Sequence, residues 1–359
     1  MSTSLLSSLC RAVLRVTLAA CALGVSGCAA MQPQFDGRVQ EIEGVRFRII
    51  DTGYTGRGWV WYSDRQLLLN GSPNASAEAM RSDPTSGDRF FLLDTSGMKG
   101  LEIGLRPLIA CVDADRIRYV LQSEGPKWVQ TRFEGRPGEA KAVESGILMG
   151  PDDKIDWFGC RPKPDLTQLK PPAGWVIRDA LREGDGYLVR QEVKTDAEFY
   201  NASIGWWPGP GHRVIDLEVR SRNIYLMHVR YLPWAKKYVL SVRDSSGSID
   251  RPREMRWLTL DPPSASAMSI PTGLVHNWGE NAPVKHGILL EAGPHTITRS
   301  GPIGDGAYLF VNGKVIRLLS GNVGALPISP DGCRAAVAYE PLTRKVTPPS
   351  RLLIIDFCV

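Results

Sequence analysis

The apolar residues between positions 42 and 359 come in short runs of about four to eight, and each run is bounded by Gly, Pro, Asp, Asn or Ser. An amphipathic helix would instead repeat its apolar residues every three or four positions over ten or more residues, and that period is nearly absent. Short apolar runs separated by turn residues are typical of β-strands. The pattern therefore predicts an all-β fold, and 36 glycines and 26 prolines supply the turn formers that such a fold needs.

No segment rich in Ser, Gly or charge divides residues 42–359, which predicts a single folded domain. This stretch is too long for one simple β-sandwich, which takes about 100 residues. A larger closed arrangement of strands fits its length better. An internal repeat should identify that arrangement.

The clearest repeat unit runs from Leu326 to Tyr339, where an apolar run enters the turn Ser329-Pro330-Asp331-Gly332 and a second apolar run leaves it. Proline sets the backbone angle of the first turn position. Aspartate bonds its own backbone, and glycine tolerates a positive φ. The unit is therefore expected to be a β-hairpin.

This unit resembles the repeat of TolB-like and WD-repeat-like β-propellers, whose inner hairpin carries the same turn. The resemblance implies a β-propeller over residues 42–359. A blade takes about 40 to 50 residues, which favours seven blades. Six larger blades are the alternative, with two units merged near residues 150–175. Weaker copies of the hairpin begin at Val60, Cys111, Gly150, Glu183 and Leu232.

The last repeat holds three expected strands, at residues 325–328, 334–339 and 352–357, and the printed sequence ends at Val359. A fourth strand is missing from it. Residues 45–50 form an apolar run that stands alone before the first hairpin. We expect this N-terminal strand to pair with the last blade and close the ring, which would protect an open sheet edge.

Residues 1–27 contain Arg11 and Arg15, no acidic residue, and an apolar run from Val16 to Val25 that is too short to span a bilayer as a helix. They are predicted to be an export signal. The signal ends in Val25-Ser26-Gly27-Cys28, which resembles the bacterial lipobox, where a signal peptidase cuts before a cysteine that carries diacylglycerol. Residues 28–41 are then a tether. A soluble secreted protein, cut at small residues near Cys28, is the alternative.

The lipobox resemblance implies palmitate-type acyl chains on Cys28 and hence a membrane partner. Each buried methylene contributes about 0.8 kcal/mol to membrane binding. In bacteria with two membranes, the residue after the lipidated cysteine usually decides sorting, and Ala29 is not the aspartate that retains lipoproteins in the inner membrane. The resemblance thus implies the cell outer membrane, on its periplasmic face.

The chain has seven cysteines, of which Cys10 and Cys21 leave with the signal and Cys28 takes the lipid. The four that remain, Cys111, Cys160, Cys333 and Cys358, allow three disulfide connectivities. A hairpin of residues 334–339 and 351–357 would bring Cys333 opposite Cys358, which leaves Cys111 to pair with Cys160. Four free buried thiols are the alternative.

Few sequence motifs typical of catalytic or metal-binding sites are present. The five histidines have no tight metal spacing and the cysteines no CxxC spacing, so no metal and no cofactor are expected. Ser96-Gly97-Met98-Lys99 matches the S-x-x-K signature, but it lies in a turn sequence, and we assign no catalytic residue. The mature chain carries 41 basic against 38 acidic residues after Arg11 and Arg15 leave, or +3, too little for a nucleic-acid partner.

Trp206 and Trp207 precede the rigid segment Pro208-Gly209-Pro210-Gly211-His212. Displayed aromatic side chains are common anchors for protein partners and sugar rings. Trp206, Trp207 and His212 are therefore the candidate binding residues. Packing between blades is the competing role for the two tryptophans.

The sequence favours a non-enzymatic function: a lipid-anchored binding or scaffolding module that docks an envelope protein, peptide or glycan on a propeller face. TolB-like proteins work in envelope-spanning assemblies, and the resemblance permits a similar role. The alternative is a periplasmic hydrolase or lyase that acts on envelope sugars in the central channel. A cluster of inward-facing His, Asp and Arg would favour that enzyme.

Overall fold

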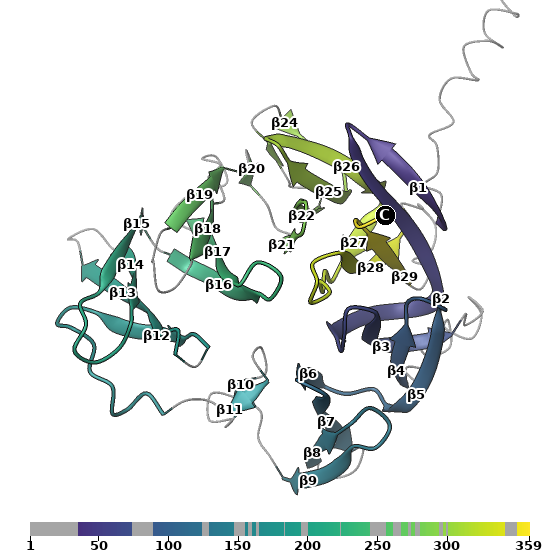
Figure 1. Ribbon diagram of the computed structural model, residues 1–359, viewed down its shortest axis with the longest axis horizontal. Helices are drawn as coiled ribbons and strands as arrows, with labels where there is room; N and C mark the ends of the chain where they lie inside the picture. The colour runs from purple at the N-terminus through teal and green to yellow at the C-terminus, as the bar shows by residue number, and fades with distance from the viewer. Residues whose placement is uncertain are drawn as a thin grey trace, which may run out of the picture. The chain divides into compact units, whose positions relative to one another are not determined.

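The structure of the chain is a computed structural model. It describes residues 35–73, 89–123, 129–146, 155–156, 160–162, 165–182, 184–194, 200–222, 224–244, 256–260, 267–271, 274–276, 281–293, 297–298, 301–341 and 350–359. All regular elements in these residues are β-strands in antiparallel sheets, and none is a helix (Figure 1). The predicted all-β class is confirmed.

The largest sheet has eight strands and joins the N-terminal to the C-terminal part of the described chain. Its order is β27-β28-β29-β2-β3-β4-β5, and β1 pairs with β2 outside this path. The strands are β1 (Asp36–Ile42), β2 (Val45–Trp61), β3 (Gln66–Pro73), β4 (Arg89–Asp94), β5 (Lys99–Leu105), β27 (Asn322–Gly324), β28 (Arg334–Glu340) and β29 (Arg351–Asp356).

The other large sheets are four-stranded and follow chain order, with an insertion in the last one. They are formed by β6 (Ile109–Asp113), β7 (Arg116–Ser123), β8 (Val129–Gly135) and β9 (Lys141–Ser145); by β12 (Val176–Ala180), β13 (Tyr187–Lys194), β14 (Tyr200–Trp207) and β15 (Ile215–Arg222); by β16 (Ile224–Leu232), β17 (Lys237–Asp244), β18 (Arg256–Leu260) and β19 (Ala267–Pro271); and by β21 (Asn281–Val284), β22 (Gly287–Ala292), β25 (Gly306–Val311) and β26 (Lys314–Ser320).

Two small sheets complete the described strands. One contains β20 (Leu274–His276), β23 (Ile297–Thr298) and β24 (Gly301–Pro302), and the other contains β10 (Ile155–Asp156) and β11 (Arg161–Pro162). The second lies in the stretch 150–175, where the six-blade alternative merges two units. Only two residues of each strand pair there.

Strand β2 changes its pairing partner along its length. Residues 48–51 pair with β29, in the register Arg48↔Asp356 to Asp51↔Leu353, and residues 54–61 pair with β3. The expected pairing of residues 45–50 with the last strand is therefore present over residues 48–50. Gly56 lies in the second half with φ +124°, where a Cβ would lie 2.1 Å from the Asn70 carbonyl oxygen, so only glycine fits.

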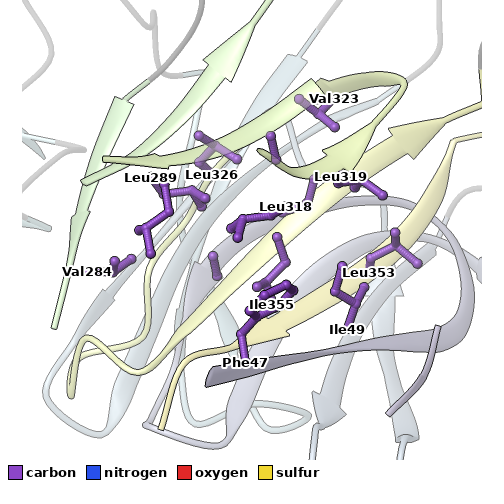
Figure 2. Close-up of a cluster of buried hydrophobic side chains, with 14 of the residues drawn as sticks. Phe47, Ile49, Val284, Leu289, Leu318, Leu319, Val323, Leu326, Leu353 and Ile355 are labelled. Carbon is purple, nitrogen blue, oxygen red and sulfur yellow. The ribbon is translucent and has the colours of Figure 1, made fainter. Parts of the chain in front are cut away.

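Strands β28 and β29 have nearly continuous apolar sequences because both of their faces are buried. Leu353 and Ile355 of β29 belong to the core cluster shared with β21, β22, β25 and β26, whereas Leu352 and Ile354 pack with Trp61 of β2. Figure 2 shows the first cluster, in which Ile355 and Leu353 lie beside side chains of β2. Burial on both faces thus ties this hairpin to two neighbouring groups of strands.

Further core clusters connect sheets that follow each other in the chain. One joins β3 and β4 to β6 and β7, a second joins β13 and β14 to β17, and a third joins β17 to β22 and β25. Burial of apolar surface contributes about 25 cal/mol per Å². These shared clusters are therefore the main stabilising contacts between the sheets.

The folded unit starts earlier than the sequence analysis placed it. The compact unit extends from Phe35 to Val359, and residues 36–42 form β1 rather than tether. Asp51 donates its backbone N–H to the Phe35 carbonyl at 3.0 Å, and the Phe35 ring packs against Tyr339 at 5.3 Å between centroids. These contacts hold the start of the unit on the large sheet.

The first strand of the last repeat also lies elsewhere than expected. It is β27, at residues 322–324, whereas within residues 325–328 only Ile328 forms an isolated bridge, to Ala335. Ala325 has a φ of +53°, which interrupts the extended conformation between the two places. The loop between β28 and β29, residues 342–349, lies outside the described residues.

Candidate functional site

A hollow of about 500 Å³ opens beside the eight-stranded sheet, and charged side chains line it. It is bordered by β1, β2, β28 and β29 and by the turns that follow β2 and β4. We call it the arginine pocket, defined by Arg48, Arg65, Arg334, Asp36 and Asp356.

Three of these side chains form a ladder across neighbouring strands. Asp356 on β29 pairs in register with Arg48 on β2 and with Arg334 on β28, so the three side chains share one face of the sheet. Asp356 is 1% exposed, and its Oδ2 accepts from Arg48 Nη2 at 2.8 Å and Nε at 3.2 Å. Arg334 Nε lies 3.5 Å from the same oxygen.

The Ser-Pro-Asp-Gly turn positions Arg334. Ser329 Oγ accepts from the Arg334 backbone N–H at 2.8 Å and is bonded to Asp331 Oδ1 at 2.5 Å. The same Asp331 oxygen accepts from the Cys333 N–H at 3.0 Å, and Gly332 takes a φ of +73°. The predicted turn is confirmed, and its side chains fix the strand residue that enters the pocket.

Arg65 reaches the pocket from the turn after β2. Its carbonyl accepts from the backbone N–H and the hydroxyl of Thr95, both at 2.8 Å, which ties this turn to the one after β4. In that second turn the Ser96 hydroxyl and N–H donate to Asp94 Oδ1 at 2.7 and 2.8 Å. These hydrogen bonds from Ser96 hold the pKa of Asp94 below its usual value, and Arg65 adds a smaller effect of its charge.

The pocket's buried carboxylate is already committed to protein donors. Asp356 Oδ2 faces the two guanidinium groups, and Oδ1 accepts from the Cys358 N–H at 3.1 Å. The Ser96 hydroxyl donates its hydrogen bond to Asp94 and, among the described residues, has no hydrogen bond with Lys99. The S-x-x-K match therefore lacks the serine–lysine pair that would activate a nucleophile. Guanidinium groups aimed into a hollow are suited to hold an anion.

None of the pocket's charged residues stands in a recognisable catalytic or binding motif of the sequence. The predicted hairpin of residues 334–339 and 351–357 carried a usable signal, because its register places Arg334 opposite Asp356. Arg48 could have been added from the expected pairing of residues 45–50. Nothing in the local sequence marks Arg65.

Both predicted disulfides are present. Cys333 is bonded to Cys358 and Cys111 to Cys160, each with a Cα–Cα distance of 5.3 Å. The first flanks the arginine pocket in sequence, because Cys333 precedes Arg334 and Cys358 follows Asp356 by two residues. The Cys358 Sγ atom of this disulfide lies 4.0 Å from His286 Nε2.

The prediction that Trp206 and Trp207 are displayed is wrong. They are 4% and 1% exposed, and their indole N–H groups donate to the carbonyls of Asp185 at 2.7 Å and His212 at 3.1 Å. The physical reason is packing: Trp206 belongs to the core cluster shared with β17, and Trp207 packs on the Tyr187 ring at 5.4 Å. His212 is exposed, and its carbonyl serves the loop's internal hydrogen bond.

Two further expectations concern a metal site and the membrane anchor. Within the described stretches, no group of three His, Cys, Asp or Glu side chains could hold a metal ion. The described residues also contain no helix with the length and apolar character to cross a membrane. The lipobox and Cys28 lie outside the described residues.

Comparisons with known proteins give no family. No family model and no curated protein matches the chain. One similar solved structure is the β-propeller domain of the Trilobed protease from Pyrococcus furiosus, described as having an open velcro topology; it is 11% identical over 82% of this chain and 84% of that one, with a TM-score of 0.31. A protein of unknown function from Dyadobacter fermentans is 12% identical over 88% and 100%, with a TM-score of 0.40. The proposals below rest on the chain's own sheets and side chains.

Proposed function

We propose that residues 35–359 form a β-propeller of seven blades. Four-stranded antiparallel meanders in chain order, with clusters that join consecutive sheets, are what supports this architecture. The stretch around β10 and β11 supplies the third blade in this count. Merging it with a neighbour gives the six-blade alternative.

Strand β2 closes the proposed ring. Its first half lies in the last blade, between β29 and the outer strand β1, and its second half is the inner strand of the first blade, beside β3. The pairing of β2 with both strands supports this role. Closure by this strand would cover the edge of β29 that the chain's last hairpin leaves unpaired.

We propose further that the chain is a lipoprotein anchored through Cys28 in the outer membrane, with the propeller on the periplasmic side. The signal-like residues 1–27 and the four-position lipobox support this location. Because the folded unit begins at Phe35, only six residues, 29 to 34, separate the anchor from it. The propeller would therefore stay close to the membrane surface.

The lipid anchor has a direct test. Replacing Cys28 by Ser should abolish incorporation of labelled palmitate and move the protein out of the outer-membrane fraction, because the acyl chains supply the membrane affinity. Cell fractionation and palmitate labelling measure both effects. Cys21→Ser, inside the expected signal, is the matched control and should leave both unchanged. Palmitate on the Cys28→Ser protein would contradict the anchor.

We propose that the function is non-catalytic: the anchored module docks an envelope ligand on the propeller face that holds the arginine pocket. The observation that carries this proposal is a pocket bordered by three arginines, two of which contact an aspartate whose two oxygens already accept from protein donors. A carboxylate so engaged suits holding a ligand more than transferring a proton. That contrast favours the binding module over a hydrolase or lyase.

Reversing the charge of Arg65 tests the binding function. Envelope partners cross-linked to the full chain in cells and recovered from gently solubilised membranes should fall about tenfold with Arg65→Glu, the loss of a charge-assisted contact. Arg136→Glu is the matched control, because Arg136 is an exposed arginine in the turn after β8, paired with Asp115 at 3.4 Å. Equal recovery from both variants, or no partner recovered with the unmodified chain, would refute this function.

A further inference from the structure

Two guanidinium groups of the arginine pocket share one carboxylate oxygen. Arg48 approaches Asp356 Oδ2 through Nη2 and Nε, and Arg334 approaches it through Nε at 3.5 Å. Arg334 also donates from Nη1 to the Asp64 carbonyl at 3.0 Å and lies 3.5 Å from Asp331 Oδ2. A buried carboxylate between two cations keeps both in place while satisfying only part of their hydrogen-bonding capacity.

Each guanidinium group has five N–H donors in a fixed fork. The acceptors named above engage Nε and Nη2 of Arg48 and Nε and Nη1 of Arg334. In the part of the chain that the structure describes, no acceptor is bonded to Arg48 Nη1 or Arg334 Nη2. The side chains of Arg48 and Arg334 are 39% and 19% exposed, so both combine fixed positions with access from the pocket.

A third cation comes from a different part of the chain. Arg65 is exposed at the pocket, on a turn that Thr95 holds through two hydrogen bonds. Asp36, the other acidic residue of the pocket, forms an ion pair with Arg38 at 2.9 Å. Three arginines from three elements therefore border one hollow, which suits a tetrahedral anion with several terminal oxygens better than a planar carboxylate.

The pocket lies next to the first residues of the folded unit, since Asp36 and Gly37 border it. Eight residues lead from Cys28 to Asp36, a span of at most about 26 to 29 Å when fully extended. If Cys28 carries the lipid, a tether of this length is compatible with a membrane lipid as one source of a bound anion.

From these observations we propose that the arginine pocket is a binding site for a phosphate ester, with Arg48, Arg65 and Arg334 donating to its oxygens. Its source is either the headgroup of a membrane lipid or a soluble phosphorylated molecule. This inference rests on the proposed binding function, and it names the chemistry of the ligand.

Calorimetric titration of the full chain in non-ionic detergent at low salt tests the proposal. The probes are glycerol 3-phosphate, a short-chain phosphatidylglycerol and a short-chain phosphatidylcholine. We expect saturable binding of at least one of the first two that weakens about tenfold with Arg65→Gln, the loss of one charge-assisted hydrogen bond. Added NaCl should weaken it further. Tighter binding of phosphatidylglycerol assigns a lipid headgroup, and tighter binding of glycerol 3-phosphate assigns a soluble ester.

Two further variants keep the test decisive. Arg136→Gln removes the same charge far from the pocket residues in sequence and should leave affinity unchanged. Arg334→Gln should weaken binding more than Arg65→Gln, and its thermal unfolding is measured alongside, because it also loses the Asp356 contact. The site is overturned if neither glycerol 3-phosphate nor phosphatidylglycerol shows saturable binding. It is also overturned if Arg65→Gln and the unmodified chain bind with equal affinity. If no phosphate probe binds while Arg65→Glu still lowers partner recovery about tenfold, this inference alone is overturned and the binding function stands.

Discussion

Replacing Phe47 by alanine is expected to lower the free energy of unfolding by about 3 to 5 kcal/mol, the usual cost of truncating a buried phenylalanine. Phe47 is fully buried in the core cluster that also contains Ile355 of β29 and Leu309 of β25. Figure 2 shows its ring beside Ile355. The truncation would leave a cavity where the N-terminal strand, the C-terminal strand and the preceding sheet meet.

Urea unfolding followed by tryptophan fluorescence measures the change, with the slope of the transition checked for equality between variants. Val39→Ala on the adjacent strand β1 is the control, because Val39 is 49% exposed and its truncation should change stability by less than about 0.5 kcal/mol. A loss below about 1 kcal/mol for Phe47→Ala would show that β2 contributes little to the core.

The contacts of Phe35 determine which strands a lipid tether would be attached to. Phe35 is the first residue of the folded unit and contacts Tyr339, while Arg351 lies over its ring at 5.3 Å. A tether that joins the unit at this point is attached to the strands that hold the N-terminal and C-terminal parts of the chain together. Force on such a tether would thus be carried by the eight-stranded sheet.

The sequence was sufficient to predict the C-terminal hairpin. Its two apolar runs are buried on both faces, they are bounded by a turn with defined side-chain bonds, and each carries a cysteine at the same end. The pairing of residues 48–50 with the last strand was also predicted, whereas the continuation of β2 to Trp61 and its pairing with β1 were not. Local pattern and sheet pairing agree at these places.

The pocket and the tryptophans depended on contacts that no local pattern encodes. Arg48 and Asp356 are separated by 308 positions, and Arg65 reaches the pocket through a turn held by Thr95. The Trp-Trp-Pro-Gly segment predicted display, but burial of Trp206 requires the neighbouring strand β17, whose Tyr238 hydroxyl donates to Asp185 at 2.6 Å. Burial and this hydrogen bond raise the pKa of Tyr238.

Removing the Cys333–Cys358 disulfide is expected to lower the free energy of unfolding by about 3.5 kcal/mol, the chain-entropy value for a closed loop of this length. The two cysteines are 25 positions apart, and the loop they close includes residues 342–349. The hairpin register should survive, because the pairs from Arg334↔Asp356 to Tyr339↔Arg351 remain. The Cys333→Ala/Cys358→Ala chain should therefore fold to the same structure and unfold at lower urea concentration.

The matched control is Cys111→Ala/Cys160→Ala, which opens a loop of 49 positions and has a chain-entropy value of about 4 kcal/mol. Only the first pair flanks the arginine pocket, so only its removal should also weaken phosphate binding, through looser placement of Arg334 and Asp356. Unchanged phosphate affinity in both double variants would mean that the strand pairs alone position the pocket. Equal stability of the Cys333→Ala/Cys358→Ala chain and the unmodified chain would show that the hairpin is already closed by its apolar contacts, and that the disulfide adds nothing to the folded state.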